Sequence, residues 1–345
     1  MTIDLSPLDK PTRLLFSIEL RALQGDRFQP TGFPSLGAAT YQTKDGQKLL
    51  VESAQSMANR LEATVWDAVG DKPVAAVDGI SHVTVKANGK FLTDTMLEAH
   101  RLNSPYILEA PGSKFVAQMK ADLGTLERGP INRKLLAQVL LKYDVGSLLH
   151  GVFLAKPDLA GGRLRVARAL SAFIEASNAR VAPSGGVKND HVNPAGDTKK
   201  GFGNVPFARD EFTAEKIVLH INFDLAQVRG YGLGLGAERL LLLLGLYRLR
   251  KLIDGDLRLR TACDLEPVTR DPMATRPEGF VLPSLADLEA DLRESIEQNR
   301  SAMVLTETSY DGKIESAKIK RREQEKDDDD GVNDEGGNGE GGGED

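Results

Sequence analysis

Several features that define familiar protein classes are scarce in this sequence. It has one cysteine, Cys263, which excludes an internal disulfide and a cysteine-rich zinc site. The longest apolar run, 240–246, is far shorter than the roughly 20 residues needed to cross a bilayer. The N-terminus also lacks a basic start followed by an apolar block. We therefore expect a cytoplasmic protein with no membrane partner.

Basic and acidic residues nearly balance over most of the chain. The formal net charge is -6, but residues 326–345 alone contain nine acidic residues, one lysine and seven glycines. Without that segment the totals of 44 basic and 50 acidic residues become 43 and 41, a net charge of +2. A slightly basic body is compatible with nucleic acid. We expect 321–345 to form a disordered acidic glycine-rich tail, because it has too few apolar side chains to offset the entropy of ordering.

The pattern of apolar residues predicts a mixture of helices and strands. Alternation, or a short buried run, indicates strands at 13–23, 148–154, 212–224 and 257–263. Helical spacing indicates a helix that begins after Ser53 as its N-cap, and further helices at 132–142, 237–253, 96–102 and 112–123. The dipeptide Asn88-Gly89 favours a tight hairpin turn. Residues 183–206 have almost no large apolar side chains and predict a long irregular loop.

A glycine-rich turn, with Gly230, Gly232, Gly234 and Gly236, lies between a predicted strand and a predicted helix. Exposed backbone N–H groups and the helix dipole would suit a phosphate there. The spacing matches neither a P-loop nor the dinucleotide fingerprint, so an RNA phosphate is favoured over a nucleotide cofactor. The alternative is a tight strand-to-helix crossing, which explains the glycines equally well.

Polar residues share a face of the helix that follows Ser53. Ser53, Ser56 and Arg60 are spaced i, i+3 and i+7, and Gln55 and Asn59 are spaced i, i+4. Hydroxyls, amides and one arginine on the same face suit contacts to the sugar-phosphate backbone that do not read sequence. The alternative is an ordinary solvated helix face.

Basic residues gather at two further places. Arg163, Arg165 and Arg168 lie close together in the chain, and the loop at 183–206 contains Lys188, Lys199, Lys200 and Phe202. Such cations grip phosphates, and an aromatic ring among them stacks or wedges against a base. The alternative for Phe202 is that it anchors the loop on the core.

Catalytic motifs are sparse. The five histidines are scattered, with no metal-ligand spacing, and no serine-hydrolase elbow is present. His100, beside Arg101, would suit acid–base cleavage of RNA, but a single histidine without a positioned partner more often has a structural or binding role. We expect no metal, no cofactor and no catalytic residue.

Two runs near the N-terminus resemble a known family. They are ALQGDRFQPTGFPSLGAATYQ at 22–42 and LVESAQSMANRLEATVWD at 50–67. Both resemble the backbone subunit of the CRISPR surveillance complex Cascade in its type I-G (formerly I-U) form, the "Cas seven" family of the RAMP superfamily. The similarity extends through HRLNSPYI at 100–107, RVARALSAFIEA at 165–176, SGGVKND at 184–190 and GYGLGLGAERL at 230–240.

The resemblance implies an α+β fold shaped like a hand, with an RNA-recognition-motif-like (ferredoxin-like) antiparallel palm and inserted finger and thumb regions. The implied parts are palm segments at 1–66, 131–182 and 207–320, with an RNA-binding loop at 24–42, a finger-like insertion at 67–130 and a thumb-like loop at 183–206. Family members stack along one CRISPR RNA beside other Cascade subunits. They present the guide for pairing with target DNA in antiviral defence.

The resemblance and the residue patterns together assign an RNA-binding set. Its members are Gln24, Arg27, Phe28, Gln29, Ser53, Gln55, Ser56, Asn59, Arg60, His100, Arg101, Arg163, Arg165, Arg168, Lys188, Lys199, Lys200, Phe202, Arg229, Tyr231, Gly232 and Gly234. Related backbones of type III complexes cut RNA with an aspartate in the loop after the first strand, and Asp26 stands in a comparable loop. An endoribonuclease using His100 or Asp26 is therefore the alternative function, and a nucleotide-binding enzyme built on the glycine-rich turn is a weaker one.

Overall fold

The structure is a computed structural model of the whole chain. It describes residues 3–33, 37–110, 113–124, 130–157, 159–189, 191–197 and 203–310. The predicted tail at 321–345, and the predicted RNA-binding residues Lys199, Lys200 and Phe202, lie outside the described residues.

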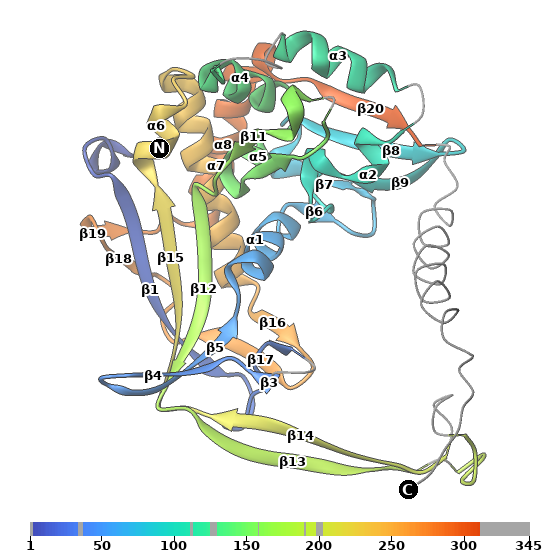
Figure 1. Cartoon of the computed structure of the whole chain (residues 1–345). Helices are drawn as coiled ribbons and strands as arrows, with labels where there is room; N and C mark the ends of the chain where they lie inside the picture. Colours follow the sequence, from blue (N-terminus) through green and yellow to red (C-terminus); the bar gives the residue numbers. More distant parts are fainter. Residues whose placement is uncertain are drawn as a thin grey trace, which may run out of the picture.

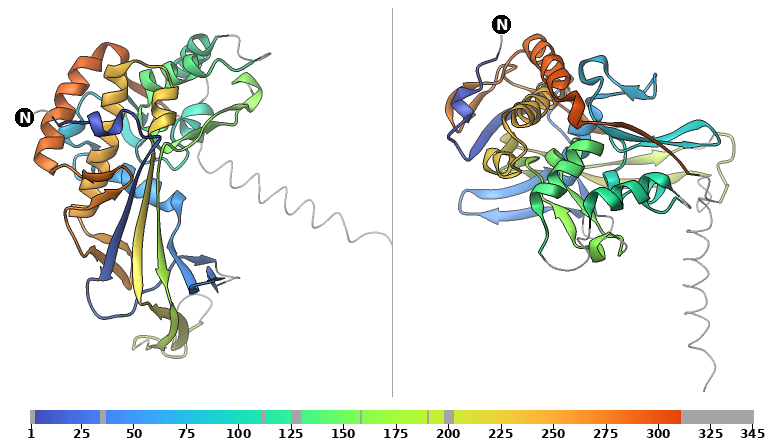
Figure 2. Two further views of the ribbon diagram at one scale, coloured as in Figure 1. Left: turned by 90° about the vertical axis from the view of Figure 1, so that its left-hand side faces the viewer. Right: turned by 90° about the horizontal axis from the view of Figure 1, so that it is seen from above.

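A seven-stranded sheet organises the molecule, and every neighbouring pair in it is antiparallel. Its order is β16-β17-β1-β15-β12-β5-β4. The strands are β1 (Arg13–Ala22), β4 (Thr40–Thr43), β5 (Gly46–Glu52), β12 (Leu170–Ser177), β15 (Lys216–Asp224), β16 (Leu257–Arg260) and β17 (Cys263–Pro267). The three long strands β1, β15 and β12 run side by side (Figures 1 and 2).

Alternation of side chains gives this sheet one buried face and one polar face. Phe16 pairs with Ile221 and Ile18 pairs with Leu219, and all four are buried. The intervening residues, such as Ser17, lie on the polar face. Because side chains in a strand point to alternate faces, the apolar set of each strand packs together on one side.

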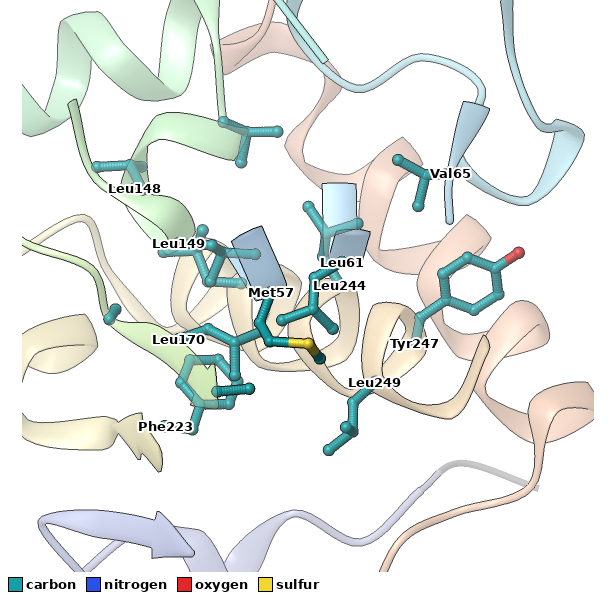
Figure 3. Close-up of a cluster of buried hydrophobic side chains, with 14 of the residues drawn as sticks. Met57, Leu61, Val65, Leu148, Leu149, Leu170, Phe223, Leu244, Tyr247 and Leu249 are labelled. Carbon is teal, nitrogen blue, oxygen red and sulfur yellow. The ribbon is translucent and has the colours of Figure 1, made fainter. Parts of the chain in front are cut away.

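Helices cover the buried face. Met57 and Leu61 of α1 (Ala54–Ala63) lie in one cluster with Leu149, Phe223 and Leu244 of neighbouring elements (Figure 3). The remaining α-helices are α2 (Pro105–Leu108), α3 (Lys114–Leu123), α4 (Arg133–Tyr143), α5 (Gly146–His150), α6 (Leu225–Gly230), α7 (Leu235–Asp254) and α8 (Leu285–Asn299). Close packing explains Gly245 within α7, since a Cβ there would lie 2.5 Å from the Phe223 ring.

Small sheets extend from this body. They are β8 (His82–Ala87), β9 (Lys90–Asp94) and β20 (Leu305–Ser309); β10 (Val152–Leu154) and β11 (Leu164–Val166); β13 (Arg180–Lys188) and β14 (Val205–Thr213); β18 (Met273–Thr275) and β19 (Glu278–Val281); β2 (Gly32–Phe33) and β3 (Gly37–Ala38); and β6 (Trp66–Asp67) and β7 (Lys72–Pro73). The β13–β14 ribbon and the β8–β9–β20 sheet extend toward the same side of the molecule, with α1 at a level between them (Figure 1).

Much of the predicted element pattern is confirmed. The first strand, the helix capped by Ser53, the hairpin at Asn88-Gly89, and the helices that became α3, α4 and α7 are all present. The predicted mixture of helices with an antiparallel sheet is also confirmed. Within the described residues, no helix is both long and apolar enough to span a membrane.

Four element predictions are wrong. The expected strand at 148–154 is α5 followed by β10, which pairs with β11 away from the main sheet. The expected loop at 183–206 begins and ends inside the paired strands β13 and β14. Residues 96–102 form no α-helix, only a 3₁₀ turn at Arg101–Asn103. The strand at 257–263 divides into β16 and β17 at Ala262, where φ is +62°.

Candidate nucleic-acid interface

A group of charged residues lies where α1 meets β5 and β16. We call Glu52, Arg60, Arg258 and Arg260 the foot cluster. Arg60 donates from Nη1 to the Arg258 carbonyl oxygen at 3.1 Å and from Nη2 to the Leu259 carbonyl oxygen at 2.5 Å. These bonds join α1 to β16, so Arg60 acts as a cross-link between two elements.

Glu52 contacts two arginines of the foot cluster. Its buried carboxylate accepts a hydrogen bond from Arg260 and lies 3.7 Å from Arg60. Arg260 Nη1 also donates to the Gln29 carbonyl at 2.9 Å and to the Val51 carbonyl at 3.2 Å. The side chain of Arg258 is instead 76% exposed, with only a 3.8 Å approach to Asp264. Arg258 is therefore the cation of this cluster that is open to a phosphate.

The loop after β1 is fixed against this cluster by its backbone. Phe28 is buried, and its N–H and C=O both pair with Phe212 at 2.9 Å. Its prediction as an RNA contact is wrong, because the ring belongs to the core. Gln29 is half-buried and its N–H donates to the Ala262 carbonyl at 2.7 Å. Gln24 and Arg27 are exposed, so their predicted contacts remain sterically open.

The polar face of α1 starts at a capped end. Ser53 Oγ accepts a hydrogen bond from the Ser56 N–H at 3.3 Å, which satisfies one of the free N–H groups of the first turn. Gln55 is exposed, and Ser56 and Asn59 are half-buried. The N-cap prediction is confirmed, whereas the predicted sugar-phosphate contacts of this face stay predictions.

A second basic region lies on a short hairpin formed by β10 and β11. We call residues 151–168 the arginine hairpin. Arg163, Arg165 and Arg168 are all exposed, and Arg165 stands directly opposite Phe153. The hairpin requires Gly151, which has φ +78°, because a Cβ there would lie 2.8 Å from the Val166 carbonyl oxygen. The structure thus brings the three predicted arginines onto one exposed element.

Arg101, another predicted RNA contact, lies inside the protein. It is 4% exposed and forms a two-point ion pair with Glu62, with Nε to Oε1 at 2.8 Å and Nη2 to Oε2. Its Nη1 donates to the Gly151 carbonyl at 3.2 Å. The prediction is wrong for Arg101, because its donors are used within the core. His100 beside it is exposed.

The surroundings of this ion pair are unusual for a protein core. Burial raises the pKa of Glu62 to about 7, against the opposing attraction of Arg101. Arg248 is fully buried, and none of its guanidinium nitrogens finds a hydrogen-bond partner among the described residues. The same holds for both ring nitrogens of His150, whose pKa burial lowers well below the ordinary value. The buried Arg101–Glu62 pair adjoins the arginine hairpin, because Arg101 donates a hydrogen bond to the Gly151 carbonyl.

The glycine-rich turn is built mainly for structure. Arg229 donates to the Leu8 carbonyl at 3.2 Å and to the Pro11 carbonyl at 2.7 Å. The buried Tyr231 donates its hydroxyl to the Leu148 carbonyl at 2.7 Å. Both residues were predicted to contact RNA, and both are occupied in holding the fold. Gly232 and Gly234 are exposed and have positive φ in the turn between α6 and α7. The prediction that this turn joins a strand to a helix is wrong, because α6 lies between β15 and the turn.

The remaining predicted residues are spread over other elements. Lys188 is exposed at the end of β13, and Asp26 is exposed in the loop after β1. Within the described part of the chain, no group of three or more His, Cys, Asp or Glu side chains is arranged to hold a metal ion.

Sequence reasoning missed Glu52, Arg258 and Arg260 of the foot cluster and Phe153 of the arginine hairpin. Arg258 and Arg260 alternate with Leu257 and Leu259 in a predicted strand, so the i, i+2 spacing already indicated a basic edge. Phe153 lies in the segment 148–154, which was predicted to be a buried strand. Its exposure depends on the separate pairing of β10 with β11, which no local pattern indicates.

Comparison with known proteins finds likenesses to CRISPR-associated proteins. Residues 14–181 match the family model of the CRISPR-associated protein GSU0053. A chain of a "CRISPR RNA-guided surveillance complex, pre-nicking" is 14% identical over 68% of this chain and 70% of that one, with a TM-score of 0.33. Csc2 of Thermofilum pendens is 9% identical over 87% of this chain and 84% of its own, with a TM-score of 0.34.

The structural likenesses are too distant to establish a shared fold, and a search of curated proteins finds no match to the sequence. The family match is of a different kind, because it runs from the first strand of the main sheet into β13. It therefore supports the recognition of a CRISPR-associated family from the sequence, because residues 14–181 are similar to the family of the CRISPR-associated protein GSU0053.

Proposed function

We propose that this chain is a non-enzymatic, guide-RNA-binding backbone subunit of a type I-G Cascade. The observation that carries the proposal is the match of residues 14–181 to a CRISPR-associated family, which includes both N-terminal runs of the resemblance. One likeness, though distant, is to a chain of an RNA-guided surveillance complex. In this role the chain binds CRISPR RNA and presents its bases for pairing with target DNA.

The exposed cations support binding through the RNA backbone. Arg27 is exposed in the loop after β1, Arg258 is exposed on β16, and the arginine hairpin that follows α5 supplies three more exposed arginines. Arginines gathered on separate elements contact successive phosphates without reading base edges. A backbone subunit needs this property, because its guide sequence differs from one CRISPR RNA to the next.

The outline of the molecule supports assembly into a filament. We assign the main sheet to an RNA-recognition-motif-like palm, residues 67–130 to the fingers and the β13–β14 ribbon to the thumb. Isolated two-stranded ribbons are only marginally stable. The ribbon extends away from the main sheet (Figure 1). A neighbouring copy, with RNA between the two, would give the ribbon the contacts that it lacks in one chain.

The direct test is to express the full chain with a CRISPR array and its neighbouring genes, then purify the complex and sequence the RNA that accompanies it. We expect CRISPR-derived RNA with similar recovery for two unrelated spacers. Recovery of no RNA, or of one spacer only, would contradict binding through the backbone.

The alternative function, RNA cleavage by Asp26 or His100, is tested with the same complex. We expect no cleavage of a complementary RNA in Mg²⁺, and the same result for Asp26→Ala and His100→Ala. Metal-dependent cuts at regular spacing that disappear in Asp26→Ala would establish an endoribonuclease instead.

A further inference from the structure

We propose that Phe153 is a stacking platform for a base of single-stranded nucleic acid, and that the arginine hairpin around it grips the adjoining phosphates. The proposal rests on the nucleic-acid binding proposed above and adds a specific contact to it. Phe153 was not among the residues that the sequence predicted to bind RNA.

Phe153 is exposed because of the alternation in β10. Val152 and Leu154 point inward and are buried, while Phe153 between them is 53% exposed. An exposed phenyl ring forgoes the stabilisation that burial of a large aromatic side chain supplies. Its flat face is, however, the feature on which unpaired bases stack, whatever their identity.

The charge around the ring favours nucleic acid as the occupant. Arg165 is the direct cross-strand partner of Phe153, and side chains in such pairs lie within reach of each other. Residues 151–168 contain Lys156, Arg163, Arg165 and Arg168 against one acidic residue, Asp158, which is a net charge of +3. An aromatic ring beside clustered cations suits a base and its phosphates better than a neutral protein surface.

Both arms of the hairpin are fixed by close packing and by hydrogen bonds to other elements. A Cβ at Gly162 would lie 2.5 Å from the Ala155 carbonyl oxygen, which shows how closely the two arms approach. Asn103 Oδ1 accepts the Ala155 N–H at 2.8 Å, and Gln227 Nε2 donates to the Ala167 carbonyl at 2.7 Å. Preorganisation of this kind lowers the entropic penalty of binding.

Arg168 provides an electrostatic reason for an anion at this position. Partial burial, and then repulsion from the buried Arg101, lower the pKa of Arg168. A phosphate placed beside Arg168 would offset that repulsion. The geometry of the ring and the charge of the hairpin therefore point to the same ligand.

The test measures binding of the full chain to fluorescent single-stranded oligonucleotides of uniform sequence, one of RNA and one of DNA. Phe153→Ala and Phe153→Leu should each weaken binding by about 5- to 150-fold, the equivalent of 1–3 kcal/mol of stacking. Phe153→Tyr should retain affinity within about twofold, because its ring also stacks. The matched control is Leu305→Ala, which truncates a 55% exposed apolar side chain on β20 and should change nothing.

Salt titration separates stacking from charge. Phe153→Ala should leave the slope of log affinity against log salt unchanged, whereas Arg165→Ala should lower its magnitude by about 0.7 on single strands. The measurements on RNA and on DNA then identify the ligand of Phe153. A larger loss of affinity for RNA indicates the guide, and a larger loss for DNA indicates the displaced strand.

Three results would overturn the inference. Wild-type affinity in Phe153→Ala would exclude stacking, and wild-type affinity in Phe153→Leu would show that only apolar bulk matters. If Phe153→Ala leaves nucleic-acid binding unchanged but lowers the number of copies of this subunit in the purified complex, the ring belongs to a protein interface. Each leaves the proposed function standing, whereas failure of the wild-type chain to bind any strand would overturn both.

Discussion

The foot cluster and the arginine hairpin use the same residue type in two different ways. In the foot cluster, Arg60 and Arg260 donate to main-chain carbonyls and lie against the buried Glu52. In the hairpin, Arg165 of β11 and Arg168, which follows β11, are exposed. A guanidinium near unpaired carbonyls becomes a structural cross-link, whereas one on an exposed hairpin remains open to phosphate.

The same contrast separates neighbouring residues in the chain. Arg101 is buried with Glu62, while His100 before it is exposed. Basic residues near a predicted binding motif therefore divide into those that hold the fold and those that face solvent. The two groups should respond differently to mutation, and four predictions test the division in order of decreasing effect.

The largest effect is expected at the buried pair. Arg101→Ala leaves the Glu62 carboxylate in the core without its partner, which should destabilise the protein by about 3–5 kcal/mol. Urea unfolding followed by circular dichroism measures the loss. Arg165→Ala is the exposed control and should change stability by less than about 0.5 kcal/mol. Equal stabilities for the two variants would contradict the division.

A smaller loss is expected in the foot cluster. Arg60→Ala removes the hydrogen bonds to the Arg258 and Leu259 carbonyls and should lower the free energy of unfolding by about 1.5–3 kcal/mol. The salt dependence of RNA binding should stay the same, because this guanidinium is already occupied. Arg258→Ala should show the reverse, with unchanged stability and a weaker salt dependence. An unchanged stability in Arg60→Ala would show that its contacts are incidental.

His150 makes the core sensitive to acid. Its folded pKa lies well below 6.5, so its contribution to stability is present above pH 6.5 and is lost as the pH falls through that value. Between pH 7.5 and 5.5, the wild-type protein should lose about 1.4 kcal/mol more than His150→Leu. Paired urea titrations at the two pH values measure this difference. Parallel losses would indicate that the imidazole titrates normally.

The smallest effect on stability, and a clear effect on binding, is expected at the hairpin. The double variant Arg165→Ala with Arg168→Ala should unfold within about 0.5 kcal/mol of the wild type. Its salt slope for single-stranded RNA should fall in magnitude by about 1.4, the value for two phosphate contacts. Fluorescence anisotropy across a range of salt concentrations measures the slope. An unchanged slope would assign these arginines to the solvated surface.

Local signals predicted the elements whose pattern is self-contained. The helix after Ser53 was predictable because its N-cap and its apolar stripe lie within one short segment of the chain. The hairpin at Asn88-Gly89 was predictable because few residue types adopt the positive φ that its turn requires. The strand β12 was not predicted, and 183–206 was misinterpreted as a loop. Apart from the Phe28–Phe212 bridge, the described residues of the two ribbon strands pair with each other, and the polar, glycine-containing β13 shows no apolar alternation.

The sequence by itself indicated the resemblance to a CRISPR-associated family, the mixture of helices and strands, and the positions of the basic residues in the chain. Tertiary structure alone decided which of those residues face solvent. Arg101, Phe28, Arg229 and Tyr231 carry the same chemistry as exposed binding residues, yet each is held by partners far away in the chain. The physical reason is that burial and hydrogen-bond partners are set by contacts between distant segments, which composition and spacing do not encode.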